Sequence, residues 1–345
     1  MRPKASGQHE HDMQEPAQPS QSCGSLAASA AAVAAPYRGR SPVTHRLAGM
    51  LRRCPLLYVP LRAAYRLFSR GRQAPCLPLK ELEFLPDVVA HGPPARTAVV
   101  VHAYYLDLLP ELRHCLSFFS DPPDVFITTP HRAAAEAIRA AVVGRCSAAR
   151  IVLAENRGRD IGPFVALLQS GRLSPYSEVL KIHLKRSSYS VAGDAWRAGL
   201  LAELCGSEAA VSSSLRILRS GTVGLVGPHQ YFLTNPKFWG SNRARTAAVL
   251  RGAGALGAQE EAALAFFAGS MFWFRPAALR LIAEAPPALF AFEEEQGQQD
   301  GTLAHALERS FCQIAAHNGF SSSSLRLDGA DISAINADRH GIPVL

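Results

Sequence analysis

Residues 155–164 hold the densest group of side chains that could bind a ligand or do chemistry. They read Glu-Asn-Arg-Gly-Arg-Asp-Ile-Gly-Pro-Phe. Glycine lets the backbone approach a ligand or take positive φ, and arginine forks suit phosphate oxygens. The alternative is a tight turn with an aspartate cap and solvated arginines, but two arginines, an asparagine and an aspartate this close together favour a site. The candidate donor-binding residues here are Asn156, Arg157, Gly158, Arg159 and Asp160.

A second group follows at Lys181-Ile182-His183-Leu184-Lys185-Arg186. Strand alternation would place Lys181, His183 and Lys185 on one face, yet a buried parallel strand is normally apolar on both faces. The basic residues therefore need anionic partners, and a diphosphate fits, with Lys185 and Arg186 stabilising it as a leaving group. An edge strand with a solvated basic side is the alternative.

A third group is the small turn Ala268-Gly269-Ser270 between aromatic residues. Gly269 and Ser270 are candidates for contact with an acceptor or a sugar. Trp273 is a further candidate because aromatic rings suit sugar faces, although core packing is the preferred interpretation of the aromatic residues.

A fourth group surrounds Asp300, just before an apolar helical pattern. A carboxylate here could act as general base toward an acceptor hydroxyl, and a helix N-cap is the strong alternative. His305 is a candidate acceptor or sugar contact, one turn before Glu308 on the same helix face. The acidic run 293–295 is interpreted as a solvated face.

The elements that must position these groups alternate between strand and helix. His102 and Tyr105 follow the first strand and are further candidate donor contacts. Short connections and this alternation predict an α/β fold with a mostly parallel sheet and helices on both faces. The carboxyl ends of its strands would then share one edge, where ligands bind. The predicted strands are 97–101, 124–129, 151–154, 179–183, 223–227 and 272–274, and the predicted helices are 106–119, 131–143, 161–168, 196–205, 209–220, 260–265, 276–283 and 299–311.

Composition adds limits on organisation. Of 345 residues, 48% are hydrophobic, which is enough for a sizeable core. We expect a disordered tail at 1–43, a basic amphipathic segment and linker at 44–96, an α/β domain at 97–320 and a C-terminal tail at 321–345. Residues 37–72 contain nine arginines and no acidic residue, which indicates either contact with an anionic membrane surface or a helix packed on the domain.

Targeting segments and cysteines bear on the cellular location. No signal peptide or transmembrane helix is expected, and the seven scattered cysteines suit a reducing compartment. We therefore expect a cytoplasmic protein, peripheral on the inner membrane through residues 44–72. Nucleic-acid binding is not expected, because the positive charge concentrates in the N-terminal part.

The four groups together resemble the rhamnan synthesis F family of bacterial polysaccharide-assembly proteins. The residues that carry the resemblance are 155–164, Lys181-Ile182-His183 with Lys185, 268–273 and 300–309. It covers roughly residues 97–320. The resemblance implies a rhamnosyltransferase-like, inverting glycosyltransferase of the single-domain GT-A architecture, with a nucleotide-sugar donor and a cell-surface polysaccharide or lipopolysaccharide acceptor. The alternative is a non-catalytic subunit of an assembly complex that binds glycan or nucleotide sugar.

One departure from that architecture concerns the metal. Related enzymes usually place an Asp-x-Asp pair where this chain reads Lys181-Ile182-His183. Mg²⁺ and Mn²⁺ prefer oxygen ligands, so dependence on a divalent metal is in doubt and no metal ligand is predicted. The hypothesis is that cationic residues neutralise the departing diphosphate instead.

Overall fold

The computed structural model describes residues 76–86, 89–90, 95–185, 193–298, 300–328 and 331–336. The predicted tail at 1–43, most of the segment at 44–96, and Arg186 lie outside the described residues. Within the described ranges, no helix has the length and apolar character needed to cross a bilayer.

The centre of the fold is a four-stranded parallel block. In spatial order it contains β7 (Glu178–Leu184), β4 (Thr97–Ala103), β5 (Asp124–Thr129) and β6 (Ala148–Leu153). These strands are buried because both of their faces carry apolar residues. In β4, for example, Val100 packs in one core and Val99 and Val101 pack in the other. The first four predicted strands and their parallel pairing are confirmed.

The sheet as a whole is mixed, so the expectation of a mostly parallel sheet is only partly right. Beyond β7, the three-residue strand β11 (Phe272–Phe274) runs antiparallel to both β7 and β8 (Val223–Pro228). β13 (Ser321–Asp328) then pairs in parallel with β8, and β14 (Asp331–Asn336) closes that edge antiparallel to β13. At the other edge, β2 (Glu83–Phe84) and β3 (Val89–Ala90) lie antiparallel to β6.

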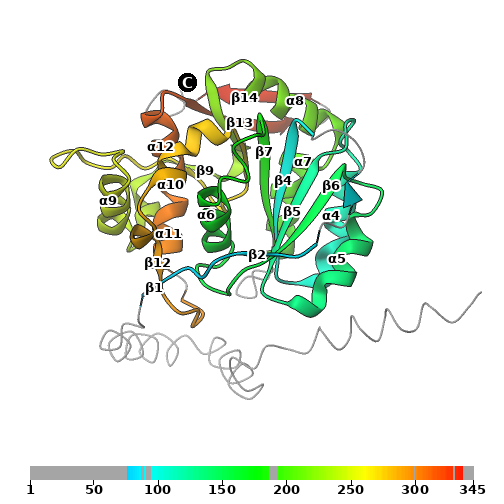
Figure 1. Cartoon of the computed structure of the whole chain (residues 1–345). Helices are drawn as coiled ribbons and strands as arrows, with labels where there is room; N and C mark the ends of the chain where they lie inside the picture. Colours follow the sequence, from blue (N-terminus) through cyan, green and yellow to red (C-terminus); the bar gives the residue numbers. More distant parts are fainter. Residues whose placement is uncertain are drawn as a thin grey trace, which may run out of the picture.

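Helices cover both faces, as predicted. Figure 1 shows one group to the left of the central strands and α4 and α5 to their right. The first group packs on the core that contains Val100 and consists of α6 (Ile161–Gln169), α9 (Arg243–Gly252), α10 (Arg280–Glu284), α11 (Leu303–Glu308) and α12 (Phe311–His317). The second packs on the opposite core and consists of α4 (Leu109–Leu116), α5 (Ala135–Val142), α7 (Gly193–Cys205) and α8 (Glu208–Arg219).

Short elements connect these layers. Outside the main sheet, β1 (Leu77–Pro78) pairs with β12 (Ala291–Phe292), and β9 (Phe232–Leu233) pairs with β10 (Phe266–Phe267). The 3₁₀ turns are η1 (Leu106–Leu108), η2 (Arg132–Ala134), η3 (His229–Tyr231), η4 (Pro236–Trp239), η5 (Pro276–Leu279) and η6 (Pro287–Phe290).

Three sequence predictions about elements were wrong. Residues 260–265 form no helix, and the predicted helix at 299–311 is two helices, α11 and α12, separated at Arg309 and Ser310. Residues 321–336, expected to be part of a tail, contain β13 and β14. The first half of β13 is serine, Ser321-Ser322-Ser323-Ser324, which carries no apolar alternation. Its burial comes from pairing with β8, a contact that no local pattern reveals.

The order of the central strands fixes where a ligand site is expected. After β4 the chain adds β5 and β6 on one side, then returns to add β7 on the other side of β4. Loops leaving β4 and β7 therefore diverge at their carboxyl ends. Such a switch point is the usual ligand position in open α/β sheets.

Candidate functional site

A row of polar side chains crosses three strands at this switch point. His102 is the register partner of Thr128 on one side and of His183 on the other. All three are buried, and His102 Nδ1 lies 3.0 Å from Thr128 Oγ1. The predicted meeting of strand ends is therefore confirmed for His102 and His183, and Thr128 joins them.

A buried ion pair lies beside the row. Lys181 Nζ donates to Asp160 Oδ2 at 2.8 Å and to the carbonyl and hydroxyl oxygens of Ser270 at 2.6 and 3.2 Å. Ser270 Oγ donates to the same Asp160 oxygen at 2.6 Å. Burial alone would raise the pKa of Asp160, but Lys181, with smaller contributions from His183 and Lys185, holds it well below the usual range. The anionic partner that Lys181 needs is thus part of the chain.

Two tight turns with positive φ present these groups. Gly158 and Arg159 have φ of 71° and 57°, and Gly269 and Ser270 have φ of 95° and 51°. A non-glycine residue in this region is strained, and such strain concentrates at functional sites. At Ser270 the conformation is held because both of its oxygens bind Lys181.

Gly158 provides a test of the first turn. A Cβ added there would lie 2.5 Å from the Phe292 ring, whereas Gly144 has a similar φ, 69°, and nothing within 4 Å. We expect Gly158→Ala to lower the free energy of unfolding by about 2–4 kcal/mol, against about 1 kcal/mol for Gly144→Ala, which shares only the backbone strain. Urea unfolding measures both, and equal losses would rule out the contact with Phe292 as a cause.

The two strand-end histidines are neutral. Burial is the main cause that lowers the pKa of His102 to about 3 and that of His183 to about 4. His183 Nε2 lies 3.0 Å from the Gly269 carbonyl, which only accepts, so Nε2 carries the proton. Nδ1 is then a buried acceptor without a partner among the described residues.

The two arginines of the 155–164 turn are turned toward the β12 region. Arg157 Nη1 donates to the Phe292 carbonyl at 3.1 Å and Nε to Glu155 at 3.3 Å. Arg159 Nη1 lies 3.0 Å from His305 Nε2, and its Nη2 donates to the Gln298 carbonyl. Arg157 therefore braces the turn, and Arg159 links it to α11. Asn156 is half-buried at the start of the turn.

Lys185 differs from the other described cations at this edge in having no fixed partner. It is half-buried just after β7, and no described residue forms a hydrogen bond or ion pair with its ammonium. Burial and then Arg159 lower its pKa, while Asp160, Glu295 and Glu308 act in the opposite direction. Lys185 thus lies in the field of several site residues without being tied to one of them.

The remaining predicted site residues differ in their burial and in their distance from the polar edge. His305 caps α11 together with Thr302 through a contact of 2.7 Å and also meets Arg159. Tyr105 is half-buried with its ring 5.0 Å from that of Tyr104. Trp273 is fully buried and donates to the Leu204 carbonyl on the opposite core, so its role as a sugar contact was a wrong prediction.

Asp300 lies apart from the buried ion pair. Its oxygens accept from the Ser241 backbone at 2.9 Å and from Asn242 Nδ2 at 2.5 Å, which ties the loop to the start of α9. The N-cap interpretation was wrong because Thr302 occupies that position. These hydrogen bonds outweigh burial and lower the pKa of Asp300.

Two carboxylates near Lys185 were not predicted as site residues. Glu308 Oε1 accepts from the Gly269 backbone at 2.7 Å, and Glu295 Oε1 accepts from the Arg159 backbone at 3.1 Å. Burial is the main cause that raises the pKa of both. Glu293 and Glu295 are thus not a solvated face: Glu293 accepts from the Leu303 backbone and pairs with Arg245. The only signal in the sequence was the helical spacing of His305 and Glu308.

The structure therefore assembles a polar edge from all four sequence groups. In the described part of the chain, no group of three or more His, Cys, Asp or Glu side chains has an arrangement that could hold a metal ion. The carboxylate of Asp160 is already paired with Lys181.

Comparison with known proteins places the chain in a family. The model of Rhamnan synthesis protein F matches residues 76–320. The match begins earlier than the expected 97, consistent with the pairing of β1, β2 and β3 with later strands. Proteins described as uncharacterized protein WxcX, from two strains of Xanthomonas campestris pv. campestris, are 34% identical over 258 residues. The alignment spans 75% of this chain and 36% of each relative, so the chain spans about a third of the relatives' length. The chain belongs to the rhamnan synthesis protein F family, whose description associates it with polysaccharide synthesis.

Proposed function

We propose that the protein is a glycosyltransferase that moves a sugar from a nucleotide-sugar donor to a growing cell-surface glycan. The observation that carries the proposal is the meeting of Asp160, Lys181, His183 and Ser270 at the carboxyl edge between β4 and β7. This is where a nucleotide lies in open α/β sheets. Membership of a family described by rhamnan synthesis supports the sugar chemistry.

Lys185 would contact the donor diphosphate. Its ammonium has no partner among the described residues, and Arg159 lies close enough to lower its pKa. A cation placed where negative charge develops on the leaving group stabilises the transition state more than the ground state. Arg186 extends the same basic run in the sequence. His183 Nδ1 is suited to accept from a donor hydroxyl.

Lys185 would neutralise the departing diphosphate, as a divalent metal does in related enzymes. Lys181 occupies the strand position of the missing Asp-x-Asp pair, and its charge is balanced by Asp160. A divalent cation beside the charge of Lys185, which pairs with no described residue, would be repelled. Turnover that chelators abolish would contradict this part of the proposal.

Glu308 is better suited than Asp300 to act as the general base. Its pKa is raised by burial, while that of Asp300 is lowered, and a base works best with a pKa nearer the operating pH. Through the Gly269 amide it also adjoins the turn that holds Lys181 and His183. A sugar hydroxyl could reach its side chain, which is 16% exposed.

Donor binding can be tested by melting temperature. A panel of dTDP-rhamnose and of GDP- and UDP-linked hexoses should contain a ligand that raises the melting temperature, since a ligand at about 100 times its Kd stabilises the native state by about 2.7 kcal/mol. Lys185→Ala should abolish the rise. Arg145→Ala removes an exposed cation just before β6 and should leave it unchanged. Equal behaviour of the two variants would exclude Lys185 as the diphosphate contact.

A non-catalytic subunit is the second candidate. It is favoured by the saturated Lys181–Asp160 pair, which leaves Asp160 unable to act on a substrate. Such a subunit would give the same melting shift without donor hydrolysis or transfer. Release of the free nucleoside diphosphate from the donor that binds therefore distinguishes the two functions, because only the enzyme releases it.

A further inference from the structure

A polar pocket lies at the amino edge of the sheet. It has a volume of about 200 Å³, and its charged lining residues are Arg96, Arg219, Arg275 and Glu178. They come from the residue before β4, the end of α8, the residue after β11 and the start of β7. Glu178 begins β7 and Lys185 directly follows its last residue, seven positions later, so the pocket is ~23 Å from the carboxyl edge at about 3.3 Å per residue.

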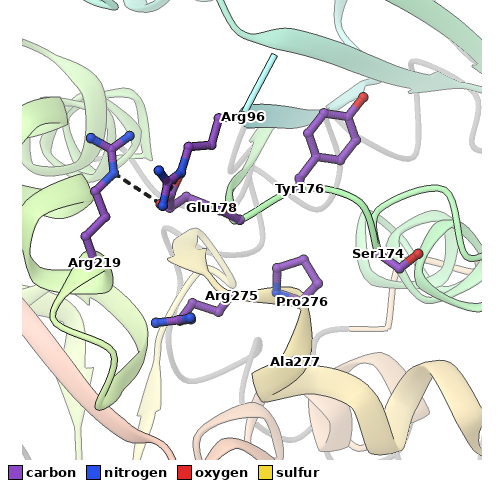
Figure 2. A pocket seen from close by; sticks show the side chains of 9 residues that line it. Arg96, Ser174, Tyr176, Glu178, Arg219, Arg275, Pro276 and Ala277 are labelled. Carbon is purple, nitrogen blue, oxygen red and sulfur yellow. Dashed lines mark hydrogen bonds and ion pairs between the residues drawn. The ribbon is translucent and has the colours of Figure 1, made fainter. Parts of the chain in front are cut away.

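Glu178 holds two of the arginines in place. Its carboxylate is buried, accepts from Arg219 Nε at 3.1 Å and lies 3.5 Å from Arg96 Nε. In Figure 2 a dashed line joins Arg219 Nε to this carboxylate, and the Arg96 guanidinium lies beside it. Both contacts use Nε, and no described residue accepts a hydrogen bond from the terminal nitrogens of either guanidinium. Those nitrogens are the donors with which arginine binds phosphate in a bidentate manner.

The pocket carries more positive charge than Glu178 requires. One arginine would neutralise a buried carboxylate, yet three arginines and one glutamate line the pocket, an excess of two positive charges. Arg275 is fixed separately, because Nη1 donates to the Leu218 carbonyl at 3.0 Å and its guanidinium lies over the Phe320 ring. The other lining residues, which include Ser174, Tyr176 and Ser177, are uncharged. They add no compensating negative charge, and the Ser174 and Tyr176 hydroxyls already donate to the Gly171 carbonyl and to Asp124.

We propose that this pocket is a binding site for a phosphoryl group, separate from the carboxyl-edge site and independent of its function. A doubly charged phosphate monoester balances the excess charge. A pocket of this size holds the phosphate and a small part of the group attached to it. The phosphoryl group belongs either to a soluble phosphate or to a lipid headgroup, and both present the same oxygens to the arginines.

Calorimetry on the full-length protein tests the site with inorganic phosphate and glycerol 3-phosphate at constant ionic strength. Arg96→Gln is the principal variant because Arg96 is 66% exposed and its loss leaves Arg219 on Glu178. Removing a charge-assisted hydrogen bond should weaken binding at least about tenfold. Arg219→Gln should weaken it similarly. Arg216→Gln makes the same charge change three residues earlier on α8, outside the pocket, and should have no effect.

Sedimentation with phosphatidic acid vesicles distinguishes the source of the phosphoryl group. Soluble binding that Arg96→Gln weakens supports a small phosphate ligand. Vesicle binding that Arg96→Gln weakens, without soluble binding, supports a lipid headgroup. The proposal is overturned if neither measurement depends on Arg96 and Arg219, or if Arg216→Gln has the same effect as the pocket variants.

Discussion

Asp160→Asn should lower the free energy of unfolding by about 3–5 kcal/mol, because it leaves a buried ammonium without its counter-charge. Lys181 is 1% exposed, and Asp160 is its partner at 2.8 Å. Asparagine keeps the shape and one acceptor oxygen, so the loss reports charge rather than packing. Marginal stability is typically 5–15 kcal/mol, so the variant should unfold at markedly lower urea concentration.

The matched control is Asp194→Asn. Asp194 also pairs with an arginine, Arg197, at 2.8 Å, but its side chain is 76% exposed, and exposed pairs contribute at most about 1 kcal/mol. The double variant Asp160→Asn with Lys181→Met removes both charges and should recover much of the loss. Equal effects of Asp160→Asn and Asp194→Asn would contradict the importance of the buried pair.

The pH dependence of the Asp160 effect has a definite sign. The folded-state pKa of Asp160 lies well below the ordinary 3.8, so its stabilisation is present above the unfolded pKa and lost only as pH falls through the depressed value. The difference between wild type and Asp160→Asn should therefore be the same at pH 7 and pH 5. Urea unfolding at the two pH values checks this.

The sequence predicted which residues belong to the polar edge better than it predicted which of them contact one another. Alternation correctly placed Lys181 and His183 on one face in need of an acidic partner, but the expected diphosphate proved, at Lys181, to be Asp160. The contacts that settle this lie far apart in the chain, such as Ser270 with Asp160 and Arg157 with Phe292. Local periodicity carries no information about such pairs.

The same limit explains the errors in the fold. The central strands were predictable because each is an apolar run bounded by turns. The antiparallel direction of β11 was not, because three residues fix no direction. It depends on the chain reaching the sheet through the Gly269-Ser270 turn at the carboxyl edge of β7. That direction matters functionally, since it brings Ser270 to Lys181.

The assignment of the general base to Glu308 and the assignment to Asp300 predict opposite effects of the Asp300→Asn substitution on kcat. Asp300→Asn keeps one acceptor oxygen and loses one of the two hydrogen bonds from Ser241 and Asn242, so we expect a loss of about 1 kcal/mol in stability and little change in kcat. If Asp300 were the base, as the sequence suggested, its replacement would instead lower kcat by about 10²–10⁴-fold.

Glu308→Gln should lower kcat by about 10²–10⁴-fold while leaving donor binding unchanged, because the amide cannot accept the acceptor's proton. It can still accept from the Gly269 amide, so the turn should persist, and the unchanged melting shift with donor verifies this. Burial raises the pKa of Glu308 above its ordinary 4.5. A base acts only when deprotonated, so wild-type kcat/KM should fall as pH decreases through that raised value. A full loss of turnover in Asp300→Asn with normal turnover in Glu308→Gln would return the role to Asp300.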